Sequence, residues 1–500
     1  MRKSGILLSI SGLPTRFGIG GFSKEAYEFV DFLAQAGQKL WQILPLGPTG
    51  YGDSPYQSFS TFAGNPYYID LEALIREGFL TEEECGTWDV GGSEEYVDYE
   101  KIYFSRYPLL KKAYERAFGE KDFAARPEYQ DFVRENACWL EDYALYMAVK
   151  DARGGESFLR WEDEIRLRKP EALEQCRQQY RADIEFYRFL QYLFQSQWKC
   201  LKEYANKKGI QIVGDIPIYV SLDSADMWAG PELFQLTREG MPSAVAGCPP
   251  DAFSVTGQLW GNPLYNWDYH RETGYAWWIQ RIAYCFELYD IVRIDHFRGF
   301  DAYWSIPYGD PTAEKGKWVQ GPGYELFDVM KRTLGDKPVI AEDLGFLTDS
   351  VLDLVARTGY PGMKVLQFAF TAGEDSGYLP HNYGRNCVVY TGTHDNDTTI
   401  GWYRLLPEGD RRKAEEYLGI SPEEADRDNR IVARRLIRAA LSSVADTAII
   451  PLQDYLGLGS EGRVNTPSTL GDNWKWRVKK GACSQELAQE IRYMTQVYGR

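Results

Sequence analysis

The chain has 500 residues, of which 44% are hydrophobic and 26% charged, and its formal net charge at pH 7 is −16. Such an acidic balance argues against a nucleic-acid partner, because affinity for nucleic acid comes largely from clustered Lys and Arg. No stretch is long enough to span a bilayer, and the apolar run at the start of the chain is too short for a signal peptide, so we expect no membrane association and a cytoplasmic location.

Apolar runs alternate with amphipathic segments, as in a parallel α/β fold. Residues 23–36 are predicted to form a helix and residues 39–46 a strand. An eighth strand near residues 66–71 would close a (β/α)8 TIM barrel. An open doubly wound sheet has the same alternation, but no Gly-rich dinucleotide fingerprint follows the first strand. The other six strands are predicted at residues 210–216, 291–295, 339–342, 364–370, 388–393 and 448–452.

Two insertions interrupt this alternation. Residues 81–204 are charged, aromatic and helix-periodic, which predicts a helical insertion subdomain. Residues 223–278 are rich in Gly, Pro, Trp and Asp, which is typical of a loop-rich insertion at the mouth of an active site. Residues 453–500 are too few for a C-terminal β-sandwich domain of about one hundred residues. We therefore predict a single catalytic barrel over residues 1–500.

Three of the predicted strands lead into an acid. Asp295 and Glu342 are the last residues of their strands, and Asp395 follows the strand of residues 388–393. Strands of an all-parallel sheet are covered on both faces, so they read as continuous Val and Ile runs, and the loops at their carboxyl ends carry the chemistry of barrel enzymes. We expect the three acids to converge at one rim of the barrel.

The neighbours of two acids suggest different protonation states. Side chains alternate along a strand, so Arg293 and Asp295 point to the same face, and the positive charge favours an ionised carboxylate. A buried structural ion pair would give the same pattern. Glu342 follows three apolar residues, which favours a raised pKa and a general acid, although a cap on the next helix is an equal reading. One ionised and one protonated carboxylate, roughly 5 to 5.5 Å apart, are what retaining glycoside chemistry requires.

His394 and Asp395 lie in a dense polar run, residues 392–398, that directly follows an apolar strand. Such a run suits the binding of hydroxyl groups. We favour no metal, because the chain has four His and lacks His-x-x-x-His or similar ligand spacing.

Several motifs in these segments resemble those of glycoside hydrolase family seventy-seven, the amylomaltases or 4-α-glucanotransferases, within the wider α-amylase-type clan. The similarity runs nearly end to end, and the motifs occur in the order in which the family has them. They are Gly52-Asp53-Ser54-Pro55-Tyr56-Gln57-Ser58, Val213-Gly214-Asp215-Ile216-Pro217-Ile218, Gly247-Cys248-Pro249-Pro250-Asp251-Ala252-Phe253-Ser254, Gly257-Gln258-Leu259-Trp260-Gly261-Asn262-Pro263, Arg293-Ile294-Asp295-His296-Phe297-Arg298-Gly299, Ala341-Glu342-Asp343-Leu344-Gly345, Gly392-Thr393-His394-Asp395-Asn396-Asp397 and Asn465-Thr466-Pro467.

The resemblance implies a role for each residue. Asp295 would be the nucleophile, Glu342 the general acid/base and Asp395 the transition-state stabiliser. The expected substrate-binding residues are Tyr56, Asp215, Asp251, Trp260, Arg293, His394 and Asn465. Asp251 belongs to a loop that the family places over the cleft. Tyr56 and Trp260 could instead be packing residues, but their polar, Gly/Pro-rich surroundings favour the cleft.

The function implied is a retaining 4-α-glucanotransferase that moves α-1,4-glucan segments between maltooligosaccharides or starch-type glucans through a covalent glycosyl-Asp intermediate. Glucose would serve as an acceptor, and no cofactor is needed. The nearest alternative is an α-glucan hydrolase of the α-amylase type, since the same intermediate serves both reactions. A non-catalytic glucan-binding protein is an alternative of another class, and a metal-dependent barrel hydrolase is a weaker one.

Overall fold

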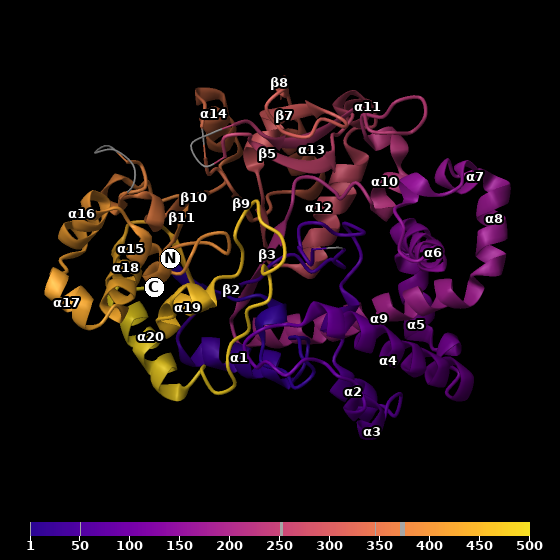
Figure 1. Cartoon of the computed structure of the whole chain (residues 1–500), viewed down its shortest axis with the longest axis horizontal. Coiled ribbons are helices and arrows are strands. Elements are labelled where there is room, and N and C mark those ends of the chain that lie inside the picture. Colours follow the sequence, from indigo (N-terminus) through magenta and orange to yellow (C-terminus); the bar gives the residue numbers. More distant parts are fainter. Residues whose placement is uncertain (1, 51, 251–253, 346, 371–375) are drawn as a thin grey trace.

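An eight-stranded parallel sheet forms the centre of the molecule (Figure 1). The structure is a computed structural model that describes residues 2–50, 52–250, 254–345, 347–370 and 376–500. The strands follow the order β10-β11-β12-β1-β2-β3-β6-β9, and every ladder between neighbours is parallel. They are β1 (Lys3–Leu7), β2 (Leu40–Gln42), β3 (Gln211–Ile216), β6 (Ile291–Ile294), β9 (Val339–Ala341), β10 (Gly362–Val365), β11 (Cys387–Tyr390) and β12 (Thr447–Pro451).

The first and last strands of that order meet and close a barrel. The backbone N–H of Ala341 in β9 donates to the carbonyl of Pro361, the residue before β10, at 3.0 Å. The predicted (β/α)8 TIM barrel is confirmed, and six of the predicted strands coincide with β2, β3, β6, β9, β11 and β12. The strand predicted at residues 364–370 overlaps β10 only at Lys364 and Val365, because the chain turns into a 3-10 helix at Leu366–Phe368.

Amphipathic helices cover the outside of the barrel (Figure 1). In α1, for example, Ala26, Phe29 and Leu33 recur with helical spacing and are buried. The α-helices are α1 (Lys24–Gln35), α2 (Leu71–Arg76), α3 (Glu82–Gly86), α4 (Tyr99–Glu120), α5 (Pro127–Glu135), α6 (Ala137–Ala152), α7 (Asp163–Arg166), α8 (Pro170–Gln179), α9 (Arg181–Lys207), α10 (Ala225–Ala229), α11 (Trp267–Glu272), α12 (Ala276–Leu288), α13 (Tyr324–Leu334), α14 (Asp349–Thr358), α15 (Thr399–Leu405), α16 (Glu408–Leu418), α17 (Pro422–Arg427), α18 (Arg430–Ser442), α19 (Leu452–Leu456) and α20 (Gln485–Val497). The 3-10 turns are η1 (Ile10–Gly12), η2 (Pro66–Tyr68), η3 (Phe123–Ala125), η4 (Phe158–Arg160), η5 (Pro231–Leu233), η6 (Phe297–Phe300), η7 (Leu366–Phe368), η8 (Pro380–Asn382) and η9 (Ser460–Gly462).

The eighth strand was predicted in the wrong place. Residues 66–71 form η2 and the start of α2, because Asn65 and Asp70 accept N–H groups of the first turn of each element. The eighth strand is β1, which pairs with β12 on one side and with β2 on the other.

The interior of the barrel is apolar up to an ion pair near its rim. In β6, Arg293 is aligned with Asp215 of β3 and with Ile340 of β9. At this level of the interior the polar Arg293 and Asp215 thus lie beside the aliphatic Ile340. The apolar residues inside are Leu7, Leu40, Val213, Ile340, Met363, Val388, Tyr390 and Ile449.

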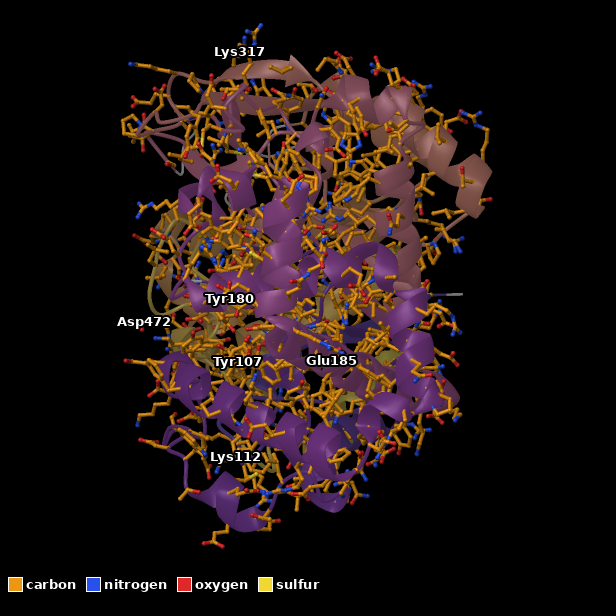
Figure 2. All side chains as sticks on the ribbon, turned by 90° about the vertical axis from the view of Figure 1, so that its right-hand side faces the viewer. Tyr107, Lys112, Tyr180, Glu185, Lys317 and Asp472 are labelled. Atoms are coloured by element: carbon orange, nitrogen blue, oxygen red, sulfur yellow. The ribbon has the colours of Figure 1, made fainter. Side chains whose placement is uncertain are left out.

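The segment for which we predict a helical insertion consists of α3 to α8 and most of α9. Its core is aromatic: the rings of Phe123, Tyr129 and Tyr192 meet edge to face with centroids 5.4 to 5.5 Å apart. Many of the aromatic residues of this chain therefore fill a core. Figure 2 views this side of the molecule, with Lys112 of α4 low in the picture and Lys317 of β8 at the top.

The segment predicted to be loop-rich, residues 223–278, also contributes to a second sheet. Two of its strands, β4 (Ala244–Cys248) and β5 (Gln258–Pro263), join β7 (Ala302–Pro307) and β8 (Lys317–Gln320) in the antiparallel order β5-β4-β7-β8. After β12 the described residues form α19, η9 and α20 but no further strand, in agreement with the predicted lack of a C-terminal β-sandwich.

Candidate active site

The carboxyl rim of the barrel carries the three acids. Asp295 directly follows β6 and Glu342 directly follows β9, and these two strands are paired. Backbone hydrogen bonds extend past both strand ends, because Asp295 N donates to Ile216 O at 2.9 Å and Glu342 N donates to Ile294 O at 3.1 Å. Asp395 lies in the loop after β11, close enough that its charge raises the pKa of Asp295.

Arg293 connects two carboxylates inside the barrel. One of its nitrogens donates to both carboxylate oxygens of Asp215 at 2.7 Å, and another lies 3.0 Å from Oδ1 of Asp295. The Arg293 and Asp215 side chains are 3% and 0% exposed, whereas Asp295 is 30% exposed. The guanidinium is thus bound by Asp215 inside the barrel and presents another nitrogen to Asp295, which remains partly exposed to solvent.

Burial and charge act in opposite directions on Asp295. Burial raises the pKa of Asp295 to about 6, Arg293 lowers it, and the charges of Asp215 and Asp395 raise it. The sequence led us to expect that Arg293 would keep this pKa low. In the free enzyme the effect of burial is larger, although Arg293 still favours the ionised form.

Glu342 is held by two backbone N–H groups. Its Oε2 accepts from the N–H of His296 at 2.7 Å and its Oε1 from the N–H of Leu344 at 2.9 Å. Burial and the charge of Asp295 raise the pKa of Glu342 to about 7, against the lowering effects of Arg293 and of these two hydrogen bonds. Arg293 thus favours the ionised form of Asp295, while burial and the charge of Asp295 favour the protonated form of Glu342.

Asp395 is fixed by groups from a distant part of the chain. The side-chain amide of Asn465 donates to Oδ1 of Asp395 at 2.6 Å, and Nε2 of His394 lies 3.4 Å from the same oxygen. Arg463 donates to the Asp395 carbonyl at 3.0 Å. The Asp395 side chain is 43% exposed, so its second oxygen is free to meet a ligand.

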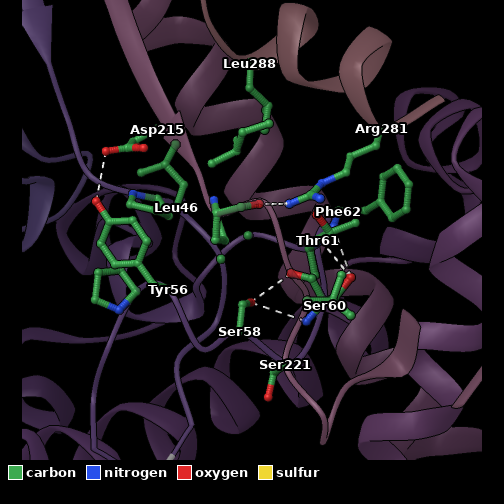
Figure 3. A pocket seen from close by; sticks show the side chains of 18 of the residues that line it. Leu46, Tyr56, Ser58, Ser60, Thr61, Phe62, Asp215, Ser221, Arg281 and Leu288 are labelled. Atoms are coloured by element: carbon green, nitrogen blue, oxygen red, sulfur yellow. Dashed lines mark hydrogen bonds between the residues drawn. The ribbon is translucent and has the colours of Figure 1, made fainter. Parts of the chain in front are cut away.

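Tyr56 lines the site through both its hydroxyl and its ring. The hydroxyl donates to Oδ2 of Asp215 at 2.9 Å (Figure 3), and the ring stacks on His394 with centroids 5.2 Å apart. The ring of Trp474 lies 5.7 Å from that of Tyr56 and 5.9 Å from that of His394. Tyr56 thus supports Asp215 and His394 at once.

Trp260 lies on the side of the site near Glu342. Its ring meets the ring of His296 edge to face at 4.8 Å, and His296 is the residue whose N–H holds Glu342. The indole N–H donates to Gln258 at 3.0 Å, so the orientation of the indole is fixed.

A cavity of about 50 Å³ adjoins the Tyr56–Asp215 pair (Figure 3). Ser58, Ser60 and Arg281 also line it. Pockets that bind small organic molecules usually measure about 300 Å³ or more, so this cavity has room for water but not for a sugar ring.

Reasoning from the sequence missed two residues of the site. His296 has φ +50°, the left-handed conformation, which aims its backbone N–H at Glu342. Trp474 approaches from the C-terminal region. A His directly after a strand is a weak sign of left-handed backbone, because His adopts that conformation more often than most residues other than Gly. Nothing in the sequence marks Trp474. Asp251, expected in the loop over the cleft, lies outside the described residues.

The described residues contain neither a membrane-spanning helix nor a cluster of metal ligands. None of their helices combines the length and the apolar character needed to cross a bilayer. No three His, Cys, Asp or Glu side chains among them are grouped as ligands of a metal ion would be.

Comparisons with known proteins show the family. A family profile described as 4-alpha-glucanotransferase matches residues 8–483. The 4-alpha-glucanotransferase of Clostridium butyricum is 50% identical over 495 residues, which cover 99% of this chain and 100% of that protein. The 4-alpha-glucanotransferase of Thermus thermophilus is 48% identical over 509 residues, which cover 100% of this chain and 99% of that protein.

Solved structures agree. The amylomaltase of Streptococcus agalactiae, determined in complex with acarbose, superposes with a TM-score of 0.96 at 43% identity and covers 100% of both chains. The chain therefore belongs to the 4-alpha-glucanotransferase family, enzymes of the amylomaltase type that act on α-glucans.

Proposed function

We propose that this glucanotransferase works by double displacement, with Asp295 as the nucleophile and Glu342 as the general acid/base. The observation that carries this assignment is the unequal environment of two neighbouring carboxyls. Asp295 faces the Arg293 guanidinium at 3.0 Å, while Glu342 has the higher pKa and lies among backbone N–H groups. Retaining glycoside chemistry needs such a pair.

In the first step an oxygen of Asp295 attacks C1 of a glucosyl residue in an α-1,4-glucan. The bond from C1 to the bridging oxygen breaks, and Glu342 gives its proton to that oxygen as the shortened chain leaves. The product is a β-linked glycosyl ester on Asp295. Arg293 favours this step because it holds the attacking oxygen in its ionised form.

In the second step the 4-hydroxyl of an acceptor attacks C1. Glu342, now ionised, takes the hydroxyl proton, and the ester bond to Asp295 breaks. Two inversions restore the α configuration. Glucose or a maltooligosaccharide is the proposed acceptor.

Asp395 is proposed to bind ring hydroxyls of the sugar at C1 and to favour its oxocarbenium-like transition state. Asn465 and His394 hold one of its oxygens and leave the other for the substrate. Trp260, which contacts His296, and Tyr56, which contacts Asp215, offer aromatic surface near the acids, and rings of this kind pack against the C–H faces of sugars.

Incubation with maltotriose tests transfer. Glucose together with chains longer than maltotriose is the expected result, whereas only shorter sugars would show hydrolysis, the alternative reaction, in which water takes the place of the acceptor.

A trapping experiment tests the assignment of Asp295. An α-maltosyl fluoride donor needs no protonation of its leaving group, so Glu342→Gln should still form the ester but should transfer it slowly. Mass spectrometry of the digested protein should find the maltosyl adduct on the peptide that contains Asp295. The double variant Glu342→Gln, Asp295→Asn is the control and should carry no adduct. An adduct on another carboxylate would refute the assignment.

A further inference from the structure

The seam between β9 and β10 differs from the other strand contacts of the barrel. Among the described residues the seven other neighbouring pairs form parallel ladders, and this pair does not. Ala341 N donates to Pro361 O at 3.0 Å. In a parallel ladder the N–H of Met363 would then donate to the carbonyl of Ala341. Instead it donates to Oδ1 of Asp343 at 2.7 Å.

The carboxylate of Asp343 is built into this seam. Its side chain is 8% exposed and lies directly against the Cα of Gly362, where a Cβ would come within 2.3 Å of Oδ2. Burial raises the pKa of Asp343, and the hydrogen bond from Met363 opposes that rise. A buried backbone N–H left without an acceptor is costly, so the carboxylate closes the barrel where the ladder fails.

Two routes lead from Asp343 to the acids proposed for catalysis. Asp343 lies between Glu342 and Leu344, whose N–H holds Oε1 of Glu342 at 2.9 Å. On the other strand, the sulfur of Met363 accepts from Nε of Arg293 at 3.4 Å, and Arg293 contacts Asp295 at 3.0 Å.

We propose that Asp343 is a positioning residue, which fixes both Glu342 and the Arg293–Asp295 pair by tying residues 342–344 to β10. The inference rests on the proposed function of those acids. Toward β6, two backbone hydrogen bonds already hold residues 342–344: Glu342 N donates to Ile294 O, and Phe297 N of η6 donates to Glu342 O. Toward β10, Ala341 N donates to Pro361 O, and the Asp343 carboxylate adds a second contact by accepting the N–H of Met363.

Asp343→Ala removes the anchor. We expect kcat for maltotriose transfer to fall about 10- to 100-fold while KM changes less than about threefold, because the acids shift but the sugar-binding surfaces remain. Asp343→Asn keeps an oxygen that can accept from Met363 and should restore kcat to within about fivefold of the wild-type value. Should Asp343→Ala not fold, Asp343→Ser, whose hydroxyl is too short to reach Met363 N, replaces it.

Asp290 offers a matched control at the opposite end of the barrel. Its Oδ2 accepts from the N–H of Ile212 in β3 at 2.8 Å, so it makes the same kind of contact just before β6 begins. Asp290→Ala should lower the thermal midpoint and leave kcat within about twofold of wild type, because the contacts it removes, from Ile212 N and Asn206 Nδ2 at 2.8 Å each and from Lys202 Nζ at 3.8 Å, all lie away from the acids.

The proposal fails if Asp343→Ala lowers the thermal midpoint but not kcat, if Asp290→Ala lowers kcat equally, or if Asp343→Asn does not restore activity. Failure of the proposed function is a separate result. It would appear in the trapping experiment on Glu342→Gln, where Asp343 is intact, as an adduct away from Asp295.

Discussion

Arg293 donates from one nitrogen to both carboxylate oxygens of Asp215, each at 2.7 Å, inside the barrel. The pair aligns in register between β3 and β6, so it is a cross-strand contact. Because Asp215 holds one nitrogen of the guanidinium inside the barrel, a second nitrogen faces Asp295 at 3.0 Å, while Nε donates to the sulfur of Met363. The position of the Arg293 charge beside Asp295, the proposed nucleophile, thus depends on Asp215. Asp215 lies 80 residues before Asp295 in the chain.

Removal of that support should destabilise the protein. Asp215→Ala leaves Arg293 buried with one partner fewer, and breaking a buried ion pair in this way costs about 3 to 5 kcal/mol. We expect a lower thermal midpoint, measured by calorimetry. Asp215→Asn keeps the hydrogen-bond acceptor and should lose less stability. An unchanged midpoint for Asp215→Ala would contradict this account of the pair.

The pH dependence of kcat/KM should be a narrow bell. Activity needs Asp295 ionised, so it should rise as the pH passes about 6, and it needs Glu342 protonated, so it should fall as the pH passes about 7. The two limbs belong to the coupled pair of carboxyls. Initial rates of maltotriose transfer between pH 4.5 and 9 test this, and a flat plateau above pH 8 would count against Glu342 as the acid.

Glu342→Gln should make stability less sensitive to pH. The folded-state pKa of Glu342 is raised from 4.5 to about 7, so its contribution to stability is fully present below pH 4.5 and is lost as the pH rises through about 7. Gln does not titrate. The thermal midpoint of the variant, relative to wild type, should therefore increase from pH 4.5 to pH 8. A constant difference across that window would show that Glu342 is not perturbed.

Asn465→Asp should impair catalysis more than Asn465→Ala. The aspartate would put a second negative charge beside Oδ1 of Asp395, where the amide now donates at 2.6 Å. We expect kcat to fall about 100-fold for Asp and about 10-fold for Ala. Asn473→Ala is the control, because Asn473 accepts from Thr466 N at 2.9 Å in the same segment without a contact to Asp395. Equal kcat losses in Asn465→Asp and Asn473→Ala would indicate a purely structural role.

The sequence by itself determined most of the barrel. Continuous runs such as Val388-Val389-Tyr390 mark strands buried on both faces, and six strands were predicted where they lie, with β10 predicted too late in the chain. The strand β1 escaped notice because Ser4 and Gly5 interrupt its apolar pattern. Gly5 is needed there, since a Cβ would come within 2.5 Å of Leu40, which belongs to the neighbouring strand. That requirement exists only once β1 and β2 pair.

The sequence also placed Asp295 and Glu342 at strand ends, since an acid after an apolar run is a local pattern. The resemblance to the family supplied the expected substrate-binding residues. Tertiary structure alone decided how the acids are held. The Met363 N–H on Asp343, the Asn465 amide on Asp395 and the stacking of Tyr56 on His394 join residues far apart in the chain. Periodicity records which face of a strand is buried, whereas partners of this kind are set by how the closed barrel brings its loops together, and no local pattern of residues carries that information.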